Sequence, residues 1–222
     1  MVSIKTSKVH DLRTSLKVLE ASGQLQKINR PVSLDCELGT LAVELENRSL
    51  GAALITNPVC KPADLYLPEA AAMPVVANVL SHPKQVALIL GCEPGNLVSF
   101  LASSMEHPIT PIEQNSAPFL ENIIRDEANL NSLPIPRHTA KDGGDRDGRF
   151  ISGGVVFARD PETGDVNASF QRFQLRGPRE TSIQINNWRH LLTYYEKAEA
   201  QDKPLPIAIA LGVDPSVSIA AG

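Results

Sequence analysis

Three polar side chains with the chemistry of an anion site, Asn167, Ser169 and Arg172, fall close together in a strand-like segment. Residues two positions apart face the same side of a strand, so Asn167 and Ser169 share a face. Arg172 would face the other side unless the strand bends or bulges. An amide oxygen, a hydroxyl and a guanidinium suit a phosphate or a carboxylate. From these residues alone a solvated strand face is the more common outcome, and an anion site is the alternative.

His190 is a second candidate, at the start of a predicted helix. A single histidine is more often structural or surface-exposed than a ligand. Together with an Asn it could supply part of a divalent-metal shell, but two ligands do not make a site, and a carboxylate would have to come from elsewhere. Positive side chains nearby either add solubility or balance an anionic cofactor; they are Arg176, Arg179 and Arg189.

A polar run near the second half of the chain contains His138, Asp142, Asp145 and Asp147. The spacing lacks the terminal Glu of a calcium-binding loop, so we expect a solvated loop. The sequence contains no GxGxxG, Walker, GxSxG or HExxH motif. The residues by themselves therefore indicate a soluble α+β protein with a candidate anion site.

The first part of the chain alternates helical and strand patterns. Leu12, Leu16 and Leu19 recur at helical spacing, and Gly23 ends that helix. The same reasoning predicts helices over 11–22, 35–47, 84–90 and 95–105, and strands over 24–28, 53–56 and 75–78. We expect these elements to form one α+β domain over residues 1–106.

Residues 107–149 read as a connector, because five prolines interrupt residues 107–137 and a Gly/Asp-rich loop follows at 142–148. A strand predicted for 150–158 carries Gly153 and Gly154, which mark a bend or a close approach. The rest of the pattern predicts a turn at 160–165, strands over 166–175 and 181–185, a helix over 188–200 and a buried strand over 205–211. We expect an antiparallel, barrel-like sheet over 150–222, with no capping segment after its last strand.

Composition narrows the function class. The chain has 222 residues, 42% hydrophobic and 21% charged, with a formal net charge of −4. This charge does not favour nucleic acid as a partner. Apolar runs such as 86–90 are too short to span a membrane, and Met1–Lys5 opens no signal-peptide core. We expect a cytoplasmic protein without a nucleic-acid or membrane partner.

The order of short motifs over the whole chain resembles the UbiD-like decarboxylases. The most specific stretches are Asp160–Gly164 and Asn167–Arg172, followed by Arg189–Leu191, Lys203–Pro206 and Gly212–Pro215. The later part is most similar to members that act on hydroxylated benzoic acids, of the hydroxybenzoate and protocatechuate type. The resemblance implies a small N-terminal α/β domain followed by part of a split-β-barrel flavin-binding domain.

The resemblance also implies a site. Asn167 and His190 match ligands of a divalent metal, usually manganese, which grips the phosphate of a prenylated FMN; potassium is a further candidate ion. Arg172 matches the residue that meets the substrate carboxylate, for which a guanidinium fork is suited. The residues that match the flavin lining are Ser169, Phe170, Gln171, Arg172, Gln184, Ile185, Asn186 and Arg189.

The implied activity is that of a carboxy-lyase on aromatic or α,β-unsaturated acids, in which the flavin is the electron sink and a carboxylic acid returns a proton. The implied partners are this acid, a flavin prenyltransferase that supplies the cofactor, and further copies in a homo-oligomer. In the family a Glu ligand and the catalytic acids follow the part matched here. We therefore expect this chain to be the front half of the site, inactive without a C-terminal half or a companion chain. The alternatives are a non-catalytic short homologue or subunit of a split decarboxylase, and an FMN-binding split-barrel oxidoreductase.

Overall fold

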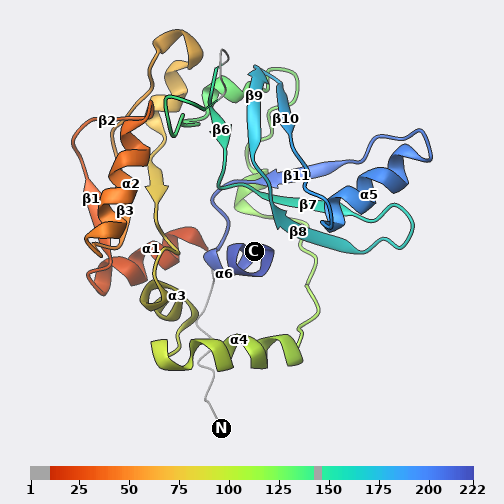
Figure 1. Cartoon of the computed structure of the whole chain (residues 1–222), viewed down its shortest axis with the longest axis horizontal. Coiled ribbons are helices and arrows are strands. Elements are labelled where there is room, and N and C mark those ends of the chain that lie inside the picture. Colours follow the sequence, from red (N-terminus) through yellow and green to blue (C-terminus); the bar gives the residue numbers. More distant parts are fainter. Residues whose placement is uncertain (1–10, 143–146) are drawn as a thin grey trace.

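The computed structural model describes residues 11–142 and 147–222, which form two lobes joined by a connector (Figure 1). The chain start, for which no signal peptide is predicted, and Asp145 lie outside the described residues.

The first lobe contains a small mixed sheet flanked by helices. In the sheet order β1-β3-β5, β1 pairs in parallel with β3, and β3 pairs antiparallel with β5; β2 and β4 form a separate parallel pair. The elements are α1 Leu12–Ala21, β1 Leu25–Ile28, β2 Val32–Ser33, α2 Glu37–Asn47, β3 Ala52–Ile55, β4 Pro58–Val59, β5 Val75–Ala77 and α3 Pro83–Leu90.

Local signals account for the helix ends in this lobe. The side chain of Asp11 accepts a hydrogen bond from the Thr14 amide at 2.6 Å and so caps α1. Gly91 ends α3 in the left-handed region, at φ 70°. The two predicted helices therefore form where the sequence places them.

The connector begins after α4 (Leu97–Glu106) and contains short helical turns at Pro118–Leu120 and Leu130–Ser132. Its irregular course confirms the prediction from its prolines. No single helix among the described residues is long and apolar enough to cross a membrane; α3 and Pro94–Glu106 pass the test only as a pair bent by 89°.

The second lobe contains two three-stranded antiparallel sheets, ordered β10-β9-β6 and β11-β7-β8. Its strands are β6 Phe150–Ile151, β7 Val155–Arg159, β8 Val166–Phe170, β9 Phe173–Gly177, β10 Glu180–Ile183 and β11 Ile207–Ala210. The antiparallel pairing and the mixed α+β class are confirmed. Among the described strands the sheets do not close into a barrel.

Two long strands predicted for this lobe are each divided. The first breaks between β6 and β7 at Gly154, where a Cβ would lie 2.7 Å from the side chain of Ile209, so only glycine fits. The second breaks between β8 and β9 at Gln171 and Arg172. Each break lets the chain pass from one three-stranded sheet to the other.

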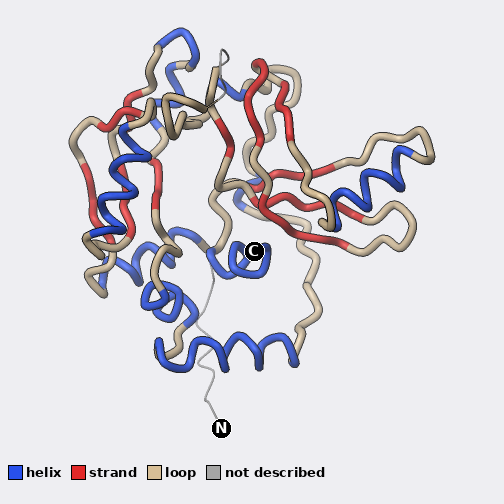
Figure 2. The backbone as a smooth tube through the Cα atoms, in the orientation of Figure 1, coloured by secondary structure: helices blue, strands red, loops and turns tan. Residues whose placement is uncertain are grey.

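Two predictions about the last residues are wrong. A helix, α6 (Pro215–Ala221), follows β11; it is capped by the side chain of Asp214 and contacts both α3 and β8. The segment predicted as a buried strand, 205–211, is not buried, since Ile207 is 41% and Leu211 48% exposed. Among the described strands β11 pairs with β7 alone, so it is an edge strand. Figure 2 shows α6 with α1, α3 and α4 along the lower side of the molecule, below the strands.

A single apolar core holds the second lobe together. Helix α5 (His190–Glu199) packs its buried face onto this core. Its first residue, His190, belongs to the candidate site. The buried members of the core are Ile135, Ile151, Val156, Ala158, Phe173, Leu175, Leu191 and Tyr194.

Candidate functional site

Asn167 and His190 meet although they are 23 residues apart in the chain. Asn167 lies on β8 and His190 is the first residue of α5. The Oδ1 atom of Asn167 is 3.0 Å from Nδ1 of His190. The structure therefore brings an oxygen donor and a nitrogen donor to one point.

Helix α5 is fixed over β8 by both apolar and charged contacts. Leu191, Tyr194 and Ala198 form its buried face. Lys197 reaches Asp160, in the turn between β7 and β8, at 2.8 Å. The hydrogen bond from Lys197 lowers the pKa of the Asp160 carboxyl, and the same contact raises the pKa of Lys197. This packing sets where His190 stands.

Ser169 and Gln171 are buried and contact each other. Both side chains are 9% exposed, and Nε2 of Gln171 donates to Oγ of Ser169 at 3.5 Å. Phe170, between them, is exposed. The burial of Ser169 and the exposure of Phe170 fit the alternation predicted for this strand, whereas Asn167 and Ala168 are both half-buried.

Arg172 occupies the bend between β8 and β9. Its Cζ lies 4.4 Å above the centre of the Phe150 ring, and its Nη2 is 3.6 Å from Oδ1 of Asp142. The side chain is still 59% exposed. The guanidinium thus has a defined direction and N–H groups left for a ligand.

The chain from Gln184 to Arg189 leads from β10 into α5. Ile185 packs against the core, whereas Gln184, Asn186 and Arg189 are exposed. Trp188 is 98% exposed and has a φ of 72°, a conformation that costs a bulky residue roughly 1–2 kcal/mol. This strained step lies two residues before His190.

The other two arginines of the predicted positive group make contacts of their own. Arg179 donates to the backbone carbonyls of Arg125 and Asp126, so it ties the connector to the second lobe. Arg176 donates to the Ser182 hydroxyl at 2.8 Å.

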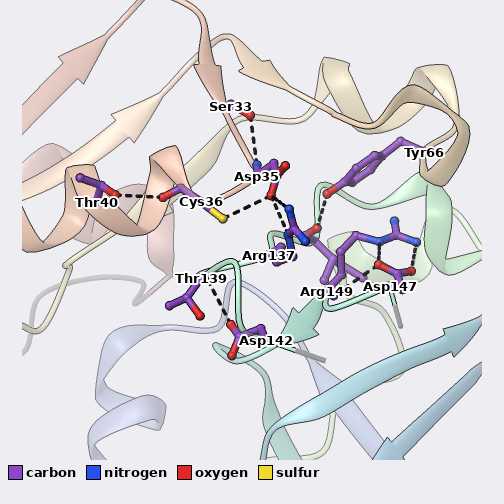
Figure 3. A network of polar contacts seen from close by, with 11 residues as sticks. Ser33, Asp35, Cys36, Thr40, Tyr66, Arg137, Thr139, Asp142, Asp147 and Arg149 are labelled. Atoms are coloured by element: carbon purple, nitrogen blue, oxygen red, sulfur yellow. Dashed lines mark hydrogen bonds and ion pairs between the residues drawn. The ribbon is translucent and has the colours of Figure 1, made fainter. Parts of the chain in front are cut away.

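A polar network between the lobes was missed by the sequence reasoning (Figure 3). Arg149 is 3% exposed; it pairs with Asp147 at 2.6 Å, donates to the Leu65 carbonyl, and lies 4.5 Å above the Tyr66 ring. Burial raises the pKa of Tyr66 to about 12. The solvated-loop interpretation is wrong for Asp142 and Asp147, which are 19% and 20% exposed and have ion-pair partners.

The donor set fits part of a metal site. Within residues 11–142 and 147–222, no group of three or more His, Cys, Asp or Glu is placed to hold a metal ion. An amide oxygen and an imidazole nitrogen, as in Asn167 and His190, suit a divalent ion that takes mainly oxygen donors. Any remaining donors would have to be phosphate oxygens, water or residues beyond this group.

Comparison with known proteins identifies the family of both halves of the chain. The N-terminal domain of 3-octaprenyl-4-hydroxybenzoate carboxy-lyase, called UbiD_N, matches residues 16–105, and the Rift-related UbiD domain of the same carboxy-lyase matches residues 110–222. This chain belongs to the UbiD family of decarboxylases.

Two named relatives of this UbiD-family chain are decarboxylases. It is 38% identical to the anhydromevalonate phosphate decarboxylase of Methanothermobacter thermautotrophicus over 148 residues, 67% of this chain and 33% of that protein. It is 30% identical to the phenolic acid decarboxylase of Sedimentibacter hydroxybenzoicus over 223 residues, 95% of this chain and 44% of that protein.

Solved structures agree with the family. The UbiD-class enzyme HmfF from Pelotomaculum thermopropionicum in complex with FMN has a TM-score of 0.80 at 31% identity, over 93% of this chain and 43% of that one. An evolved dimeric form of HmfF in complex with prenylated FMN has the same TM-score and identity, over 94% of this chain and 45% of that one. This UbiD-family chain spans less than half the length of these relatives.

Proposed function

We propose that this chain forms the cofactor-side part of a carboxy-lyase that acts on aromatic or α,β-unsaturated carboxylic acids with prenylated FMN. The observation that carries the proposal is the 3.0 Å approach of Asn167 Oδ1 to His190 Nδ1 on two separate elements. Similarity to a relative bound to prenylated FMN supports the choice of cofactor.

In this proposal, Asn167 and His190 are two ligands of a divalent ion, manganese, that holds the flavin phosphate. Potassium is a further candidate ion. When bound, the prenylated flavin supplies an electron sink for the carbon that loses its carboxylate. The lining comprises Ser169, Phe170, Gln171, Arg172, Gln184, Ile185, Asn186 and Arg189.

Arg172 has the substrate role. Its guanidinium offers two parallel N–H groups to the carboxylate and cannot lose its charge. Phe150 and Asp142 fix its direction, at 4.4 Å and 3.6 Å, before a substrate arrives. A carboxylate held in this way is oriented for loss of carbon dioxide.

We propose that the proton donor for the product carbon comes from outside the residues described. Glu180 and Glu196 are exposed, and the Asp142 carboxylate is engaged with Arg172 at 3.6 Å. A positioned general acid is worth about 10²–10⁴ in rate. We propose that the donor belongs to the rest of a longer polypeptide or to a companion chain, and that residues 1–222 alone do not turn over hydroxybenzoic or cinnamic-type acids. Turnover equal to that of a full-length relative would contradict this part.

The test of the cofactor is a mass measurement. The chain is expressed together with a flavin prenyltransferase and purified with manganese, and its bound flavin is released and weighed. We expect prenylated FMN in the unchanged chain and much less in Asn167→Ala and His190→Ala. Unmodified FMN as the sole bound flavin would favour a split-barrel oxidoreductase, and no flavin in any preparation would favour a non-catalytic short homologue or subunit. The non-catalytic alternative is supported by the coverage, since this chain matches 44% of the length of the phenolic acid decarboxylase.

A further inference from the structure

Ser152 directly follows β6 and Arg172 directly precedes β9. In the antiparallel ladder of β6 and β9, Phe150 faces Gln174 and Ile151 faces Phe173. Each step along β6 is one step back along β9, so the same register continued by one residue would place Ser152 opposite Arg172. Alternation puts Phe150 and Ser152 on one face. The guanidinium over the Phe150 ring is the diagonal contact that this register predicts.

His138 joins this face from the connector. Its Nε2 lies 2.8 Å from Oγ of Ser152. The charges of Asp142 and Arg172 both act on the imidazole, which agrees with a position beside their ion pair. Burial lowers the pKa of His138, so the ring is neutral near pH 7 and has one N–H donor.

The first lobe holds the backbone on which His138 stands. The Arg137 amide donates to the Leu34 carbonyl at 3.0 Å, and Arg137 accepts from the Cys36 amide at 2.8 Å. Nε of Arg137 also donates to Asp35 at 2.6 Å, as Figure 3 shows. A Cβ on Gly39 of α2 would lie 2.7 Å from the His138 carbonyl oxygen, so the helix passes very close. The first lobe therefore fixes the backbone that carries His138.

We propose that His138 is a positioning residue for substrate: its Nε2–H donates to the Ser152 oxygen and leaves the Ser152 hydroxyl hydrogen free for the carboxylate held by Arg172. With the other tautomer, Nε2 would accept that hydrogen and the hydroxyl would be lost to the ligand. The inference rests on the proposed role of Arg172. It adds a second donor to the carboxylate site and explains why a neutral histidine is fixed there.

The test uses sodium benzoate as the probe carboxylate, added to the 222-residue chain with ¹⁵N-labelled histidine. We expect saturable benzoate binding, and His138 ring nitrogen shifts of the Nε2–H tautomer. Ser152→Ala and His138→Phe should each weaken binding about tenfold, the effect of one hydrogen bond to a charged group. In His138→Gln an amide N–H replaces the ring N–H, and binding should stay within about threefold. His107→Gln, an exposed histidine at the end of α4, is the matched control.

The outcomes distinguish a failure of the proposed function from a failure of the role of His138. Unchanged benzoate binding in Arg172→Gln, or none by the unchanged chain, would refute the carboxylate site and with it the proposed function. Binding lost in Arg172→Gln but kept within twofold in both Ser152→Ala and His138→Phe would refute only the role of His138. Equal losses in His138→Phe and His138→Gln would indicate packing rather than hydrogen bonding. An Nδ1–H tautomer would mean that Nε2 accepts the Ser152 hydroxyl hydrogen. Either result overturns the positioning role.

Discussion

Lys197 Nζ lies 2.8 Å from Asp160 Oδ2 and ties α5 to the β7–β8 turn. Asp160 also accepts the amides of Glu162 and Thr163, so one carboxylate shapes the turn and holds the helix. The helix that carries His190 is thereby fixed to the hairpin that carries Asn167.

The first prediction concerns this ion pair. Lys197→Met should lower the melting temperature. The pKa of Asp160 is lowered in the fold and that of Lys197 is raised. The contribution of the Asp160 carboxylate to stability is therefore present above its unfolded pKa of about 3.9, and it is lost as the pH falls through the lower folded pKa. The contribution of the Lys197 ammonium is lost only as the pH rises through its folded pKa, above about 10.4.

Thermal melts of the unchanged chain and the variant between pH 2 and pH 8 check this. The gap in melting temperature should close in acid. Lys203→Met is the control, since the Lys203 side chain donates to Gln201 and has no ion pair within the described part of the chain. A gap that stays constant down to pH 2 would contradict the role of the Asp160 charge.

The second prediction concerns the contact between the lobes. Arg149→Met should lower the free energy of unfolding by about 3–5 kcal/mol, because Asp147 loses its partner and the carbonyl of Leu65 loses its donor. Chemical denaturation measures the change. Arg48→Met, which removes only an exposed pair with Glu44, should cost about 0.3–0.5 kcal/mol. Equal effects of the two substitutions would show that the inter-lobe network adds no more stability than one exposed ion pair.

The third prediction is the pH dependence caused by His138. Burial, helped by the charge of Arg172 and opposed by that of Asp142, lowers the pKa of its imidazole. The unfolded chain therefore takes up this proton first, near pH 6.5, and stability falls as the pH drops through that value towards the folded pKa. His138→Gln should lose this part of the acid destabilisation between pH 8 and pH 5. An unchanged pH profile of the melting temperature in the variant would contradict the prediction.

Much of the fold follows from local signals. The cap at Asp11, the stop at Gly91 and the turn at Asp160–Gly164 act within a few residues, and the elements they bound lie close to their predicted places. The helix α6 escaped prediction because seven residues give too little periodicity, although its Asp-Pro start is a cap signal.

Long-range contacts were beyond the sequence pattern. Arg137 meets Asp35 across 102 residues, and Arg149 meets the Leu65 carbonyl across 84. No spacing rule links such positions, so a Gly/Asp-rich loop was read as solvated. At the site, residue types indicated an anion or metal role, and resemblance singled out Asn167 and His190. Their 3.0 Å approach depends on the packing of α5, which no local pattern contains.

The central claim, a metal-assisted flavin-phosphate site at Asn167 and His190, is tested most directly by titrating the chain with prenylated FMN with and without Mn²⁺. Tightly held Mn²⁺ is followed by electron paramagnetic resonance and flavin binding by absorbance. The account predicts that Mn²⁺ tightens flavin binding and that Asn167→Ala and His190→Ala each abolish this gain, while Lys203→Met keeps it. Flavin binding that is indifferent to Mn²⁺, or a gain that survives both alanine substitutions, would contradict the account.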